Sequence, residues 1–303
     1  MIKTRFTEMF GIKHPIVQGG MQWVGRAELA SAVSNAGALG IITGLTQPTP
    51  EDLSKEIKRC REMTDQPFGV NLTILPTLVP RPYGEYIDAI CQSGVKIVET
   101  AGNNPKPFLP KLKEHGIKVI HKCTSVRHGV SAEKAGVDAI SMDGFECAGH
   151  PGEDDVPNLV LLPAAANVIK IPMLASGGFA DARGLVAALA LGCDGINMGT
   201  RFMATVESDL NRWGRERLLA MRETDTIVTR AMTGATVRCI RTPEIVAYEE
   251  AVARGVPEAE LQQDIRGALR RLYYTVSGDL AEQGKGFGRL PTGTLLGNTV
   301  DPT

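Results

Sequence analysis

The sequence predicts an α/β protein, a closed (β/α)₈ TIM barrel followed by a small, mainly helical C-terminal addition. Two observations support this. Eight short apolar runs recur between residues 16 and 199, and stretches with helical spacing separate them. Runs that are apolar on both faces and alternate with helices are typical of a parallel sheet, and eight such units favour a closed barrel. An open doubly wound sheet fits the same alternation, so the pattern only favours the barrel.

The predicted strands are short and often rich in β-branched residues. They are Ile16–Gly20, Leu39–Thr43, Phe68–Leu72, Lys96–Thr100, Lys118–Lys122, Ala139–Asp143, Pro172–Ser176 and Gly195–Gly199. Between them, capping signals mark helix ends. Thr49 can serve as an N-cap, Pro50 suits the first helical position, and Asp52 can complete a capping box. Glycine ends several helices before the next strand, at Gly116, Gly136 and Gly192.

We expect three segments along the chain: the barrel over residues 1–205, a small helical subdomain over 206–280 that can close over the barrel, and an extended or mobile tail over 281–303. Residues 243–255 and 258–276 have helical patterns. An apolar stripe in the second pattern indicates core or subunit packing; it comprises Leu261, Ile265, Leu269 and Leu272.

Composition limits the function classes. The 303 residues carry a formal net charge of −1, which argues against a general nucleic-acid binder. The charged start does not resemble a secretory signal, and no stretch is long enough to span a bilayer. The six cysteines are scattered without zinc-site spacing, so we expect reduced thiols and no metal. A cytoplasmic enzyme acting on a small molecule is the expectation.

The ends of the predicted strands carry polar residues and glycines. If the barrel is right, these ends form its catalytic face. The longest such segment follows the sixth strand and reads "DGFECAGHPGEDD", with a histidine, a thiol and several carboxylates. Glycines follow the last two strands, at Gly177, Gly178 and Gly199, where backbone N–H groups can bind a phosphate. These glycines could instead serve only to make tight turns.

Six motifs, in order, resemble those of the nitronate monooxygenase (2-nitropropane dioxygenase-like) family of FMN-dependent barrels. They are "VQGGMQWVGRAELA", "FGVNLT", "VIHKC", "DGFECAGHPGEDD", "ASGGFADARGLVAALALG" and "INMGTRF". The long fourth motif resembles in particular the branch that includes NADH:quinone reductases. The resemblance weakens after Phe202: residues 206–212 lack the usual link with proline and histidine, and the tail after Asp279 differs from that of relatives.

The resemblance implies an FMN site. Gly177, Gly178, Gly199 and Thr200 would hold the phosphate, and Lys122 would stabilise negative charge at the N1/O2 edge of the reduced ring. A surface lysine is the alternative for Lys122. The other implied cofactor contacts are Gly20, Met21 and Gln22 along the ring, Asn71 and Thr73 as hydrogen-bonding groups, and Ala148, Gly149 and Ser176.

His150 is the implied catalytic residue, because its loop would lie above the flavin and its imidazole can take a proton or donate a hydrogen bond. The acidic residues around it are expected to form a solvated rim, or one of them to orient His150; they are Glu146, Glu153, Asp154 and Asp155. No base is paired with Cys147 by spacing, which disfavours it as a nucleophile. His121 and His128 are expected to be structural or exposed.

Three function classes follow from the resemblance. The first is an FMN-dependent oxidoreductase that either oxidises alkyl nitronates or nitroalkanes with dioxygen, or passes electrons from NAD(P)H to a quinone. The second is a flavin-dependent enoyl-thioester reductase. The third is a flavin-binding protein without turnover. A homodimer is a further expectation. The sequence does not choose between NADH and NADPH, or between the acceptors.

Overall fold

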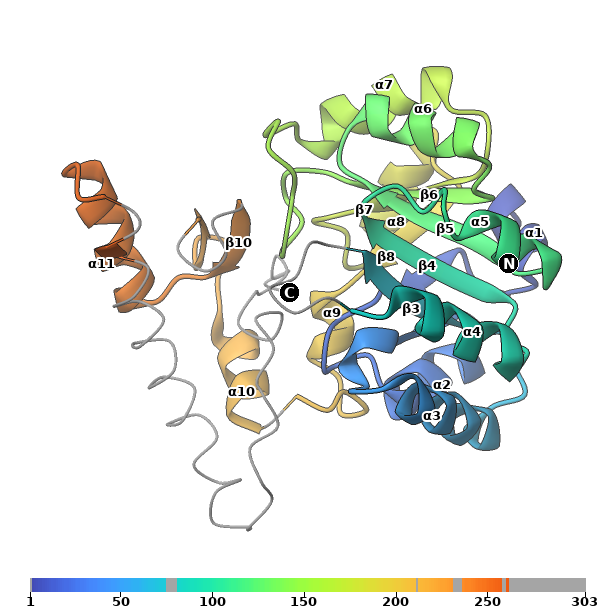
Figure 1. Ribbon diagram of the computed structural model, residues 1–303. Coiled ribbons are helices and arrows are strands. Elements are labelled where there is room, and N and C mark those ends of the chain that lie inside the picture. The colour runs from blue at the N-terminus through green and yellow to red at the C-terminus, as the bar shows by residue number, and fades with distance from the viewer. Residues whose placement is uncertain (1, 75–80, 211, 231–235, 258–259, 262–303) are drawn as a thin grey trace, which may run out of the picture.

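Eight parallel strands close into a barrel in the computed structural model, in the order β1 to β8 around the ring (Figure 1). The structure describes residues 2–74, 81–210, 212–230, 236–257 and 260–261. Each strand pairs with the next, and β8 pairs with β1 through Ile16 and Ile196. The strands are β1 (Ile16–Gln18), β2 (Leu39–Thr43), β3 (Phe68–Ile74), β4 (Ile97–Gly102), β5 (Lys118–Cys123), β6 (Ala139–Asp143), β7 (Met173–Ser176) and β8 (Gly195–Met198). The predicted barrel is therefore confirmed.

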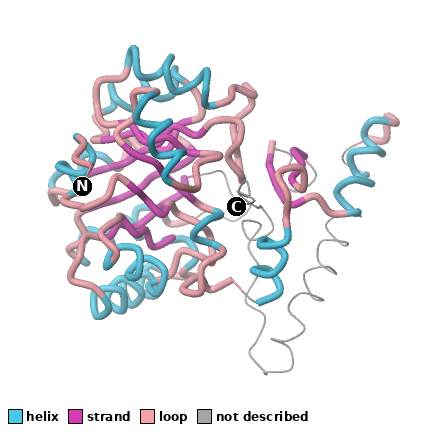
Figure 2. Tube along the Cα trace, turned by 180° about the vertical axis from the view of Figure 1, so that it is seen from behind, coloured by secondary structure: helices cyan, strands magenta, loops and turns pink. Residues whose placement is uncertain are grey.

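Helices surround the barrel, as the view from behind also shows (Figure 2). They are α1 (Arg5–Phe10), α2 (Ala27–Asn35), the 3₁₀ turn η1 (Gly44–Thr46), α3 (Pro50–Met63), α4 (Tyr83–Ser93), α5 (Leu109–Glu114), α6 (Val126–Ala135), α7 (Asn158–Val168), α8 (Ala182–Ala190) and α9 (Thr200–Met203). The expected cap at Thr49 is confirmed, since its side chain accepts a hydrogen bond from the Asp52 N–H at 3.1 Å. Gly136 ends α6 in the left-handed conformation.

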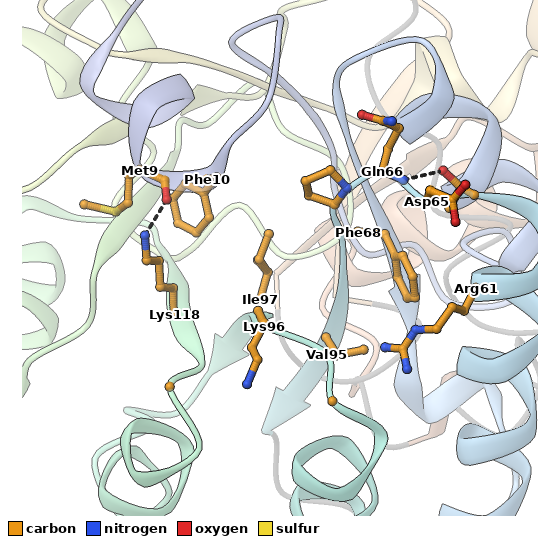
Figure 3. Close-up of a pocket in the computed structure, with 14 residues that line it drawn as sticks. Met9, Phe10, Arg61, Asp65, Gln66, Phe68, Val95, Lys96, Ile97 and Lys118 are labelled. Carbon is orange, nitrogen blue, oxygen red and sulfur yellow. Dashed lines mark hydrogen bonds between the residues drawn. The ribbon is translucent and has the colours of Figure 1, made fainter.

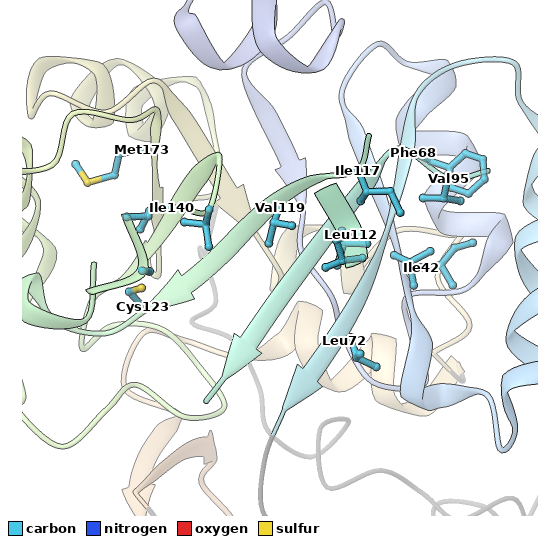
Figure 4. Packing of buried hydrophobic residues seen from close by; sticks show 14 of the residues in the cluster. Ile42, Phe68, Leu72, Val95, Leu112, Ile117, Val119, Cys123, Ile140 and Met173 are labelled. Atoms are coloured by element: carbon cyan, nitrogen blue, oxygen red, sulfur yellow. The ribbon is translucent and has the colours of Figure 1, made fainter. Parts of the chain in front are cut away.

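The main apolar core fills the layer between the strands and the helices that cover them (Figure 4). β-Branched strand residues such as Val119 and Ile140 pack there against helix residues such as Leu112, and all three are fully buried. A second cluster closes the end of the barrel at which the strands begin. There, Phe6 and Phe10 of α1 pack on Val17 and Leu174. These two clusters hold the strands rigidly, so their carboxyl ends can position polar side chains.

The chain after the barrel is not only helical. Between α10 (Arg212–Ala220) and α11 (Pro243–Ala253) lies an antiparallel two-stranded sheet, formed by β9 (Thr226–Thr229) and β10 (Val237–Ile240). Both views show it apart from the barrel strands. The sequence pattern predicts helices here and gives no sign of this sheet. Apart from residues 260 and 261, the predicted helix over 258–276 lies outside the described residues, as does the tail over 281–303.

The structure also describes the cysteines, possible metal-binding groups and the lengths of the helices. All six cysteines are free and buried, as predicted for reduced thiols. Within the described residues, no group of histidine, cysteine, aspartate and glutamate side chains is arranged to hold a metal ion. No helix in the same part of the chain is long and apolar enough to cross a membrane.

Candidate active site

The carboxyl ends of the barrel strands bring several of the predicted site residues together. The centre of this group is a residue that the sequence analysis did not select, Glu99 of β4, whose side chain is fully buried. The Gly20 N–H and the Asn71 side-chain amide both donate hydrogen bonds to Glu99 Oε2, at 2.9 and 2.7 Å. Asn197 of β8 donates to Glu99 Oε1 at 3.0 Å. One carboxylate therefore joins the ends of four elements across the barrel.

The sequence did contain a signal for Glu99. It is a charged residue inside a short apolar strand, "KIVET", and a buried carboxylate needs partners to offset its desolvation. Asn197 in "GINM" is a similar case. The strand pattern alone accounts for both residues only as strand positions. Since parallel strands place their inward side chains in shared layers, polar residues on different strands meet inside the barrel.

Lys122 of β5 lies next to this network and is not a freely solvated surface lysine, because only 22% of its side chain is exposed. Its Nζ atom is 3.5 Å from Asp143 Oδ2. Burial lowers the pKa of Lys122, but the charges of Asp143 and Glu99 more than offset this and raise it overall. The amine is therefore a fixed cation at neutral pH.

Asp143, at the end of β6, is the second carboxylate beside Lys122. Burial raises the pKa of Asp143, and the Lys122 charge opposes that shift. Its Oδ1 atom is buried and has no hydrogen-bond partner among the described residues. A buried oxygen without a partner costs free energy, so this atom is available to a donor from a bound molecule.

The ends of β7 and β8 carry the predicted phosphate site. Gly177 and Gly178 have positive φ angles of 92° and 80°, which glycine adopts without strain. A side chain at Gly177 would clash with the backbone of Cys147, whereas Gly178 is more open. Gly199 precedes α9, and the Thr200 hydroxyl is buried without a hydrogen-bond partner among the described residues. Glycine is thus required at 177 by packing as well as by conformation.

The segment after β1 supplies three more predicted contacts. Gly20, Met21 and Gln22 are half-buried, and the Met21 N–H donates to the Thr43 hydroxyl at 2.8 Å. A Cβ atom at Gly20 would lie 2.3 Å from Asn71 Cγ. Close packing on Asn71 is therefore reason enough for a glycine at position 20, whether or not a ring also approaches it. The half-buried Thr73 donates to Asn71 Oδ1 at 3.2 Å and so orients that amide.

The loop between β6 and α7 is tied to the barrel at its base. Glu146 accepts two hydrogen bonds from the Asn158 N–H, at 3.0 and 3.1 Å, at the start of α7. The Asn158 side chain donates to the carbonyls of Ser176 and Gly177 at 2.9 and 2.7 Å. Glu146 is therefore a structural residue of the loop rather than part of a solvated rim, and Asn158 connects the loop to the glycines after β7.

Cys147 and His150 of this loop differ in character. Cys147 is buried, and burial raises the pKa of its thiol, so it is a poor nucleophile at neutral pH. His150 is exposed, and Ala148 and Gly149 before it are half-buried. The protein that surrounds His150 nevertheless desolvates its charged form and lowers the pKa of the imidazole, although Glu153 opposes the shift. His150 is consequently neutral at pH 7, the form in which it can accept a proton.

Two other histidines, His121 and His128, have structural or exposed positions. His121 is buried on β5, its Nδ1 atom lies 2.8 Å from the Thr100 hydroxyl, and burial lowers its pKa to about 4. His128 is exposed on α6. Both placements agree with the sequence-based expectation.

A separate cavity of about 470 Å³ opens at the other end of the barrel (Figure 3). Arg61, Lys96 and Lys118 lie along it, and each donates a hydrogen bond to a backbone carbonyl near a helix C-terminus. This cavity is lined by the loops that precede the strands. It is therefore distinct from the candidate active site.

Polar groups at the carboxyl ends of the strands of a closed (β/α)₈ barrel define the class of barrel enzymes, whose active sites lie at this edge. Within that class, the chain belongs to the nitronate monooxygenase family, because the family profile described as "Nitronate monooxygenase" matches residues 3–283. This confirms the resemblance drawn from the six motifs. The narrower resemblance to the NADH:quinone reductase branch stays a prediction.

Similar proteins with curated names include a "Probable nitronate monooxygenase" of Staphylococcus saprophyticus, which is 32% identical over 311 residues covering 89% of this chain and 87% of its own. The "(3aS,4S,5R,7aS)-5-hydroxy-7a-methyl-1-oxo-octahydro-1H-indene-4-carboxyl-CoA dehydrogenase" of Rhodococcus jostii is 35% identical over 250 residues, which cover 82% of this chain and 69% of its own. Relatives at this level of identity thus carry more than one named activity.

Solved structures also resemble this chain. FabK from Thermotoga maritima superposes with a TM-score of 0.80 at 39% identity, over 89% of this chain and 84% of that chain. A nitroalkane oxidase from Streptomyces ansochromogenes superposes with a TM-score of 0.75 over 97% of this chain and 94% of its own. The second match is only 23% identical and shows the shared fold alone.

Proposed function

We propose that this protein is an FMN-dependent oxidoreductase that oxidises alkyl nitronates or nitroalkanes with dioxygen as the electron acceptor. The observation that carries the proposal is His150, an exposed imidazole whose pKa is lowered, at the catalytic edge of a barrel of this family. A neutral imidazole can remove the proton from the carbon beside a nitro group. That step converts a nitroalkane into its nitronate.

Features of this chain fit FMN. The Thr200 hydroxyl is buried without a partner among the described residues, and a phosphate oxygen would satisfy it. Gly177 and Gly178 have no side chains to cover their backbone N–H groups, which could donate to the phosphate. We therefore assign Ser176, Gly177, Gly178, Gly199 and Thr200 to the phosphate end.

The polar network around Glu99 would form the ring end of the same site. Bound FMN would accept electrons from the substrate and pass them to dioxygen. Lys122 would stabilise the negative charge that reduction adds to the ring, and the two carboxylates beside it keep its amine protonated. Asn71 and Thr73, together with Gly20, Met21 and Gln22, would contact the ring or the ribityl chain. Ala148 and Gly149 would bring the loop close to it.

Replacing His150 tests the proton-transfer step. His150→Asn keeps a side chain of similar size and one hydrogen-bonding group but cannot act as a base. We expect turnover of a neutral nitroalkane to fall by roughly 10²-fold or more, while turnover of the preformed nitronate falls much less. Flavin content, measured by absorbance, should match that of the parent. Equal losses with both substrates would contradict a role for His150 in taking the proton.

Reduction of a quinone by NAD(P)H is a second candidate, favoured by the resemblance of "FECAGHPGEDD" to the reductase branch. No carbon acid has to be ionised in that reaction. His150→Asn should then alter mainly substrate affinity and change the rate of flavin reduction by less than about 10-fold. A thioester substrate is a third candidate, favoured by the carboxyl-CoA dehydrogenase among the relatives.

One experiment separates the first two candidates. The purified protein is mixed anaerobically with NADH, with NADPH or with a nitronate, and the flavin absorbance is followed in time. Bleaching by the nitronate alone supports the nitronate reaction. Bleaching by a nicotinamide alone, followed by reoxidation with a quinone, supports the reductase and overturns the proposal.

A further inference from the structure

The loop that carries His150 is held by the small sheet that follows the barrel. Gly149, next to His150, forms an antiparallel bridge with Arg238 of β10: the Arg238 N–H donates to the Gly149 carbonyl at 2.9 Å, and the Gly149 N–H donates back at 3.2 Å. These residues are 89 positions apart in the sequence. The contact therefore links the candidate catalytic loop to a segment outside the barrel.

The Arg238 side chain strengthens this link on the N-terminal side of His150. Its Nε and Nη2 atoms donate to the Phe145 carbonyl at 3.3 and 3.0 Å, and its guanidinium lies 4.7 Å from the centre of the Phe145 ring. A third contact runs from Nη1 to the Thr226 hydroxyl of β9 at 3.2 Å. Arg238 thus holds both strands of the sheet and the start of the loop in one arrangement.

Glu153 forms the second link, on the C-terminal side of His150. Its Oε2 atom accepts hydrogen bonds from the Thr236 hydroxyl at 2.6 Å and from Arg230 Nη2 at 2.7 Å. Its Oε1 atom accepts from the Thr236 N–H at 3.2 Å. An exposed ion pair alone contributes little, but here a hydroxyl and a backbone N–H converge on the same carboxylate. Glu153 is therefore not simply part of a solvated acidic rim.

The two links matter because the backbone on both sides of His150 contains glycines, although the base of the loop is tied by Glu146 and Asn158. Gly149 and Gly152 flank His150 and have positive φ angles of 80° and 87°. Glycines lower the free-energy cost of changing the backbone conformation. A loop of this composition therefore does not hold the His150 imidazole in one position by itself. A base that is misplaced by about 1 Å can cost roughly 10²-fold in rate. His150 lies between anchors on both sides.

We propose that Arg238 and Glu153 are positioning residues for His150. We call the set of contacts between the loop and the segment of β9 and β10 the clasp, and we propose that it holds the candidate catalytic loop in place. The clasp consists of Phe145, Gly149 and Glu153 on the loop and Thr226, Arg230, Thr236 and Arg238 on the sheet segment. The catalytic consequence rests on the proposed role of His150. The proposal that the clasp holds His150 in position does not depend on that role, and it is tested separately.

The position of His150 can be followed directly by NMR of the histidine side chains, because the chain has five histidines. The protein as purified is labelled in its imidazoles, and the His150 signal is assigned by its loss in His150→Asn. In Arg238→Ala we expect this signal to move, broaden or split while the other four stay in place. Arg238→Lys, which keeps the charge beside Phe145, should restore the parent signal in part. Arg254→Ala, at an exposed arginine after α11, is the matched control and should change nothing.

Glu153 has its own signature. Its negative charge raises the pKa of His150, so Glu153→Gln should move the NMR titration of His150 to lower pH. Thr236→Val removes one hydroxyl of the clasp and leaves the charge of Glu153 in place. It should therefore perturb the His150 signal through position alone. These two variants keep the proposal testable if Arg238→Ala does not fold.

Kinetics then connect position to function. In Arg238→Ala, kcat for a nitroalkane should fall by about 10-fold or more with unchanged flavin content, and KM should change less. A His150 signal that is identical in the parent, Arg238→Ala and Thr236→Val would overturn the clasp. If the parent has no nitroalkane activity but the signal moves in the variants, the proposed function fails and the clasp stands.

Discussion

Replacing Glu99 by glutamine is the most direct test of the network inside the barrel. Its two oxygens accept three hydrogen bonds, from Gly20, Asn71 and Asn197, at 2.7 to 3.0 Å. A glutamine side chain has one oxygen in place of two and adds an NH₂ group. If its oxygen takes the place of Oε2, the NH₂ group faces the donating amide of Asn197. Glu99→Gln therefore leaves donors without acceptors in a fully buried position.

The expected loss follows from the cost of each unsatisfied buried group, which is about 1–3 kcal/mol. One donor on Asn197 and at least one on the new amide are left without partners, so the free energy of unfolding should fall by about 2–6 kcal/mol. Rotation of the Asn197 amide could recover part of this, but it would give up the bond from that amide to the Ser141 hydroxyl at 3.1 Å. The same substitution removes a charge that raises the pKa of Lys122.

Urea unfolding followed by circular dichroism measures the effect, with parent and variant compared at equal flavin content. Glu62→Gln, at an exposed position on α3, is the control and should stay within about 0.5 kcal/mol of the parent. If Glu99→Gln also stays within about 0.5 kcal/mol, then the carboxylate does not hold the strand ends together, and the reasoning from its three hydrogen bonds is wrong.

Three further predictions follow. Gly178→Leu should abolish FMN binding, because position 178 has a φ of 80° and the side chain would occupy the phosphate approach; flavin absorbance per protein measures this, and full occupancy would contradict the placement. The depressed pKa of His121, about 4 against 6.5, means that the unfolded chain binds the extra proton, so stability should rise with pH between about 4 and 6.5. His121 contributes up to about 3 kcal/mol to this rise in the free energy of unfolding. In His121→Asn, the midpoint of urea unfolding should therefore depend less on pH between about 4 and 6.5. Thr49→Ala should cost about 1 kcal/mol by removing the cap of α3, which thermal unfolding would detect as a lower Tm.

The sequence by itself favoured the barrel over an open sheet and predicted the edge at which the candidate site would lie. Strand runs such as Leu39–Thr43 and Ala139–Asp143 coincide with β2 and β6 because their signal is local: a short apolar run between helix caps and glycines. The positions of Lys122 and His150 followed from one rule, that parallel strands of a barrel end at the same face. Neither inference required knowledge of which side chains touch.

Only the tertiary structure decided what surrounds those residues. The structural role of Glu99 depends on Gly20, which follows β1, and on Asn71 and Asn197 of two other strands. The clasp brings Arg238 against Gly149 although the two are far apart in the chain, and β9 and β10 were not identified at all. Such contacts are non-local: a glutamate in an apolar run or an arginine after the barrel acquires a partner only when folding has already placed distant segments side by side, and burial then makes that partner obligatory.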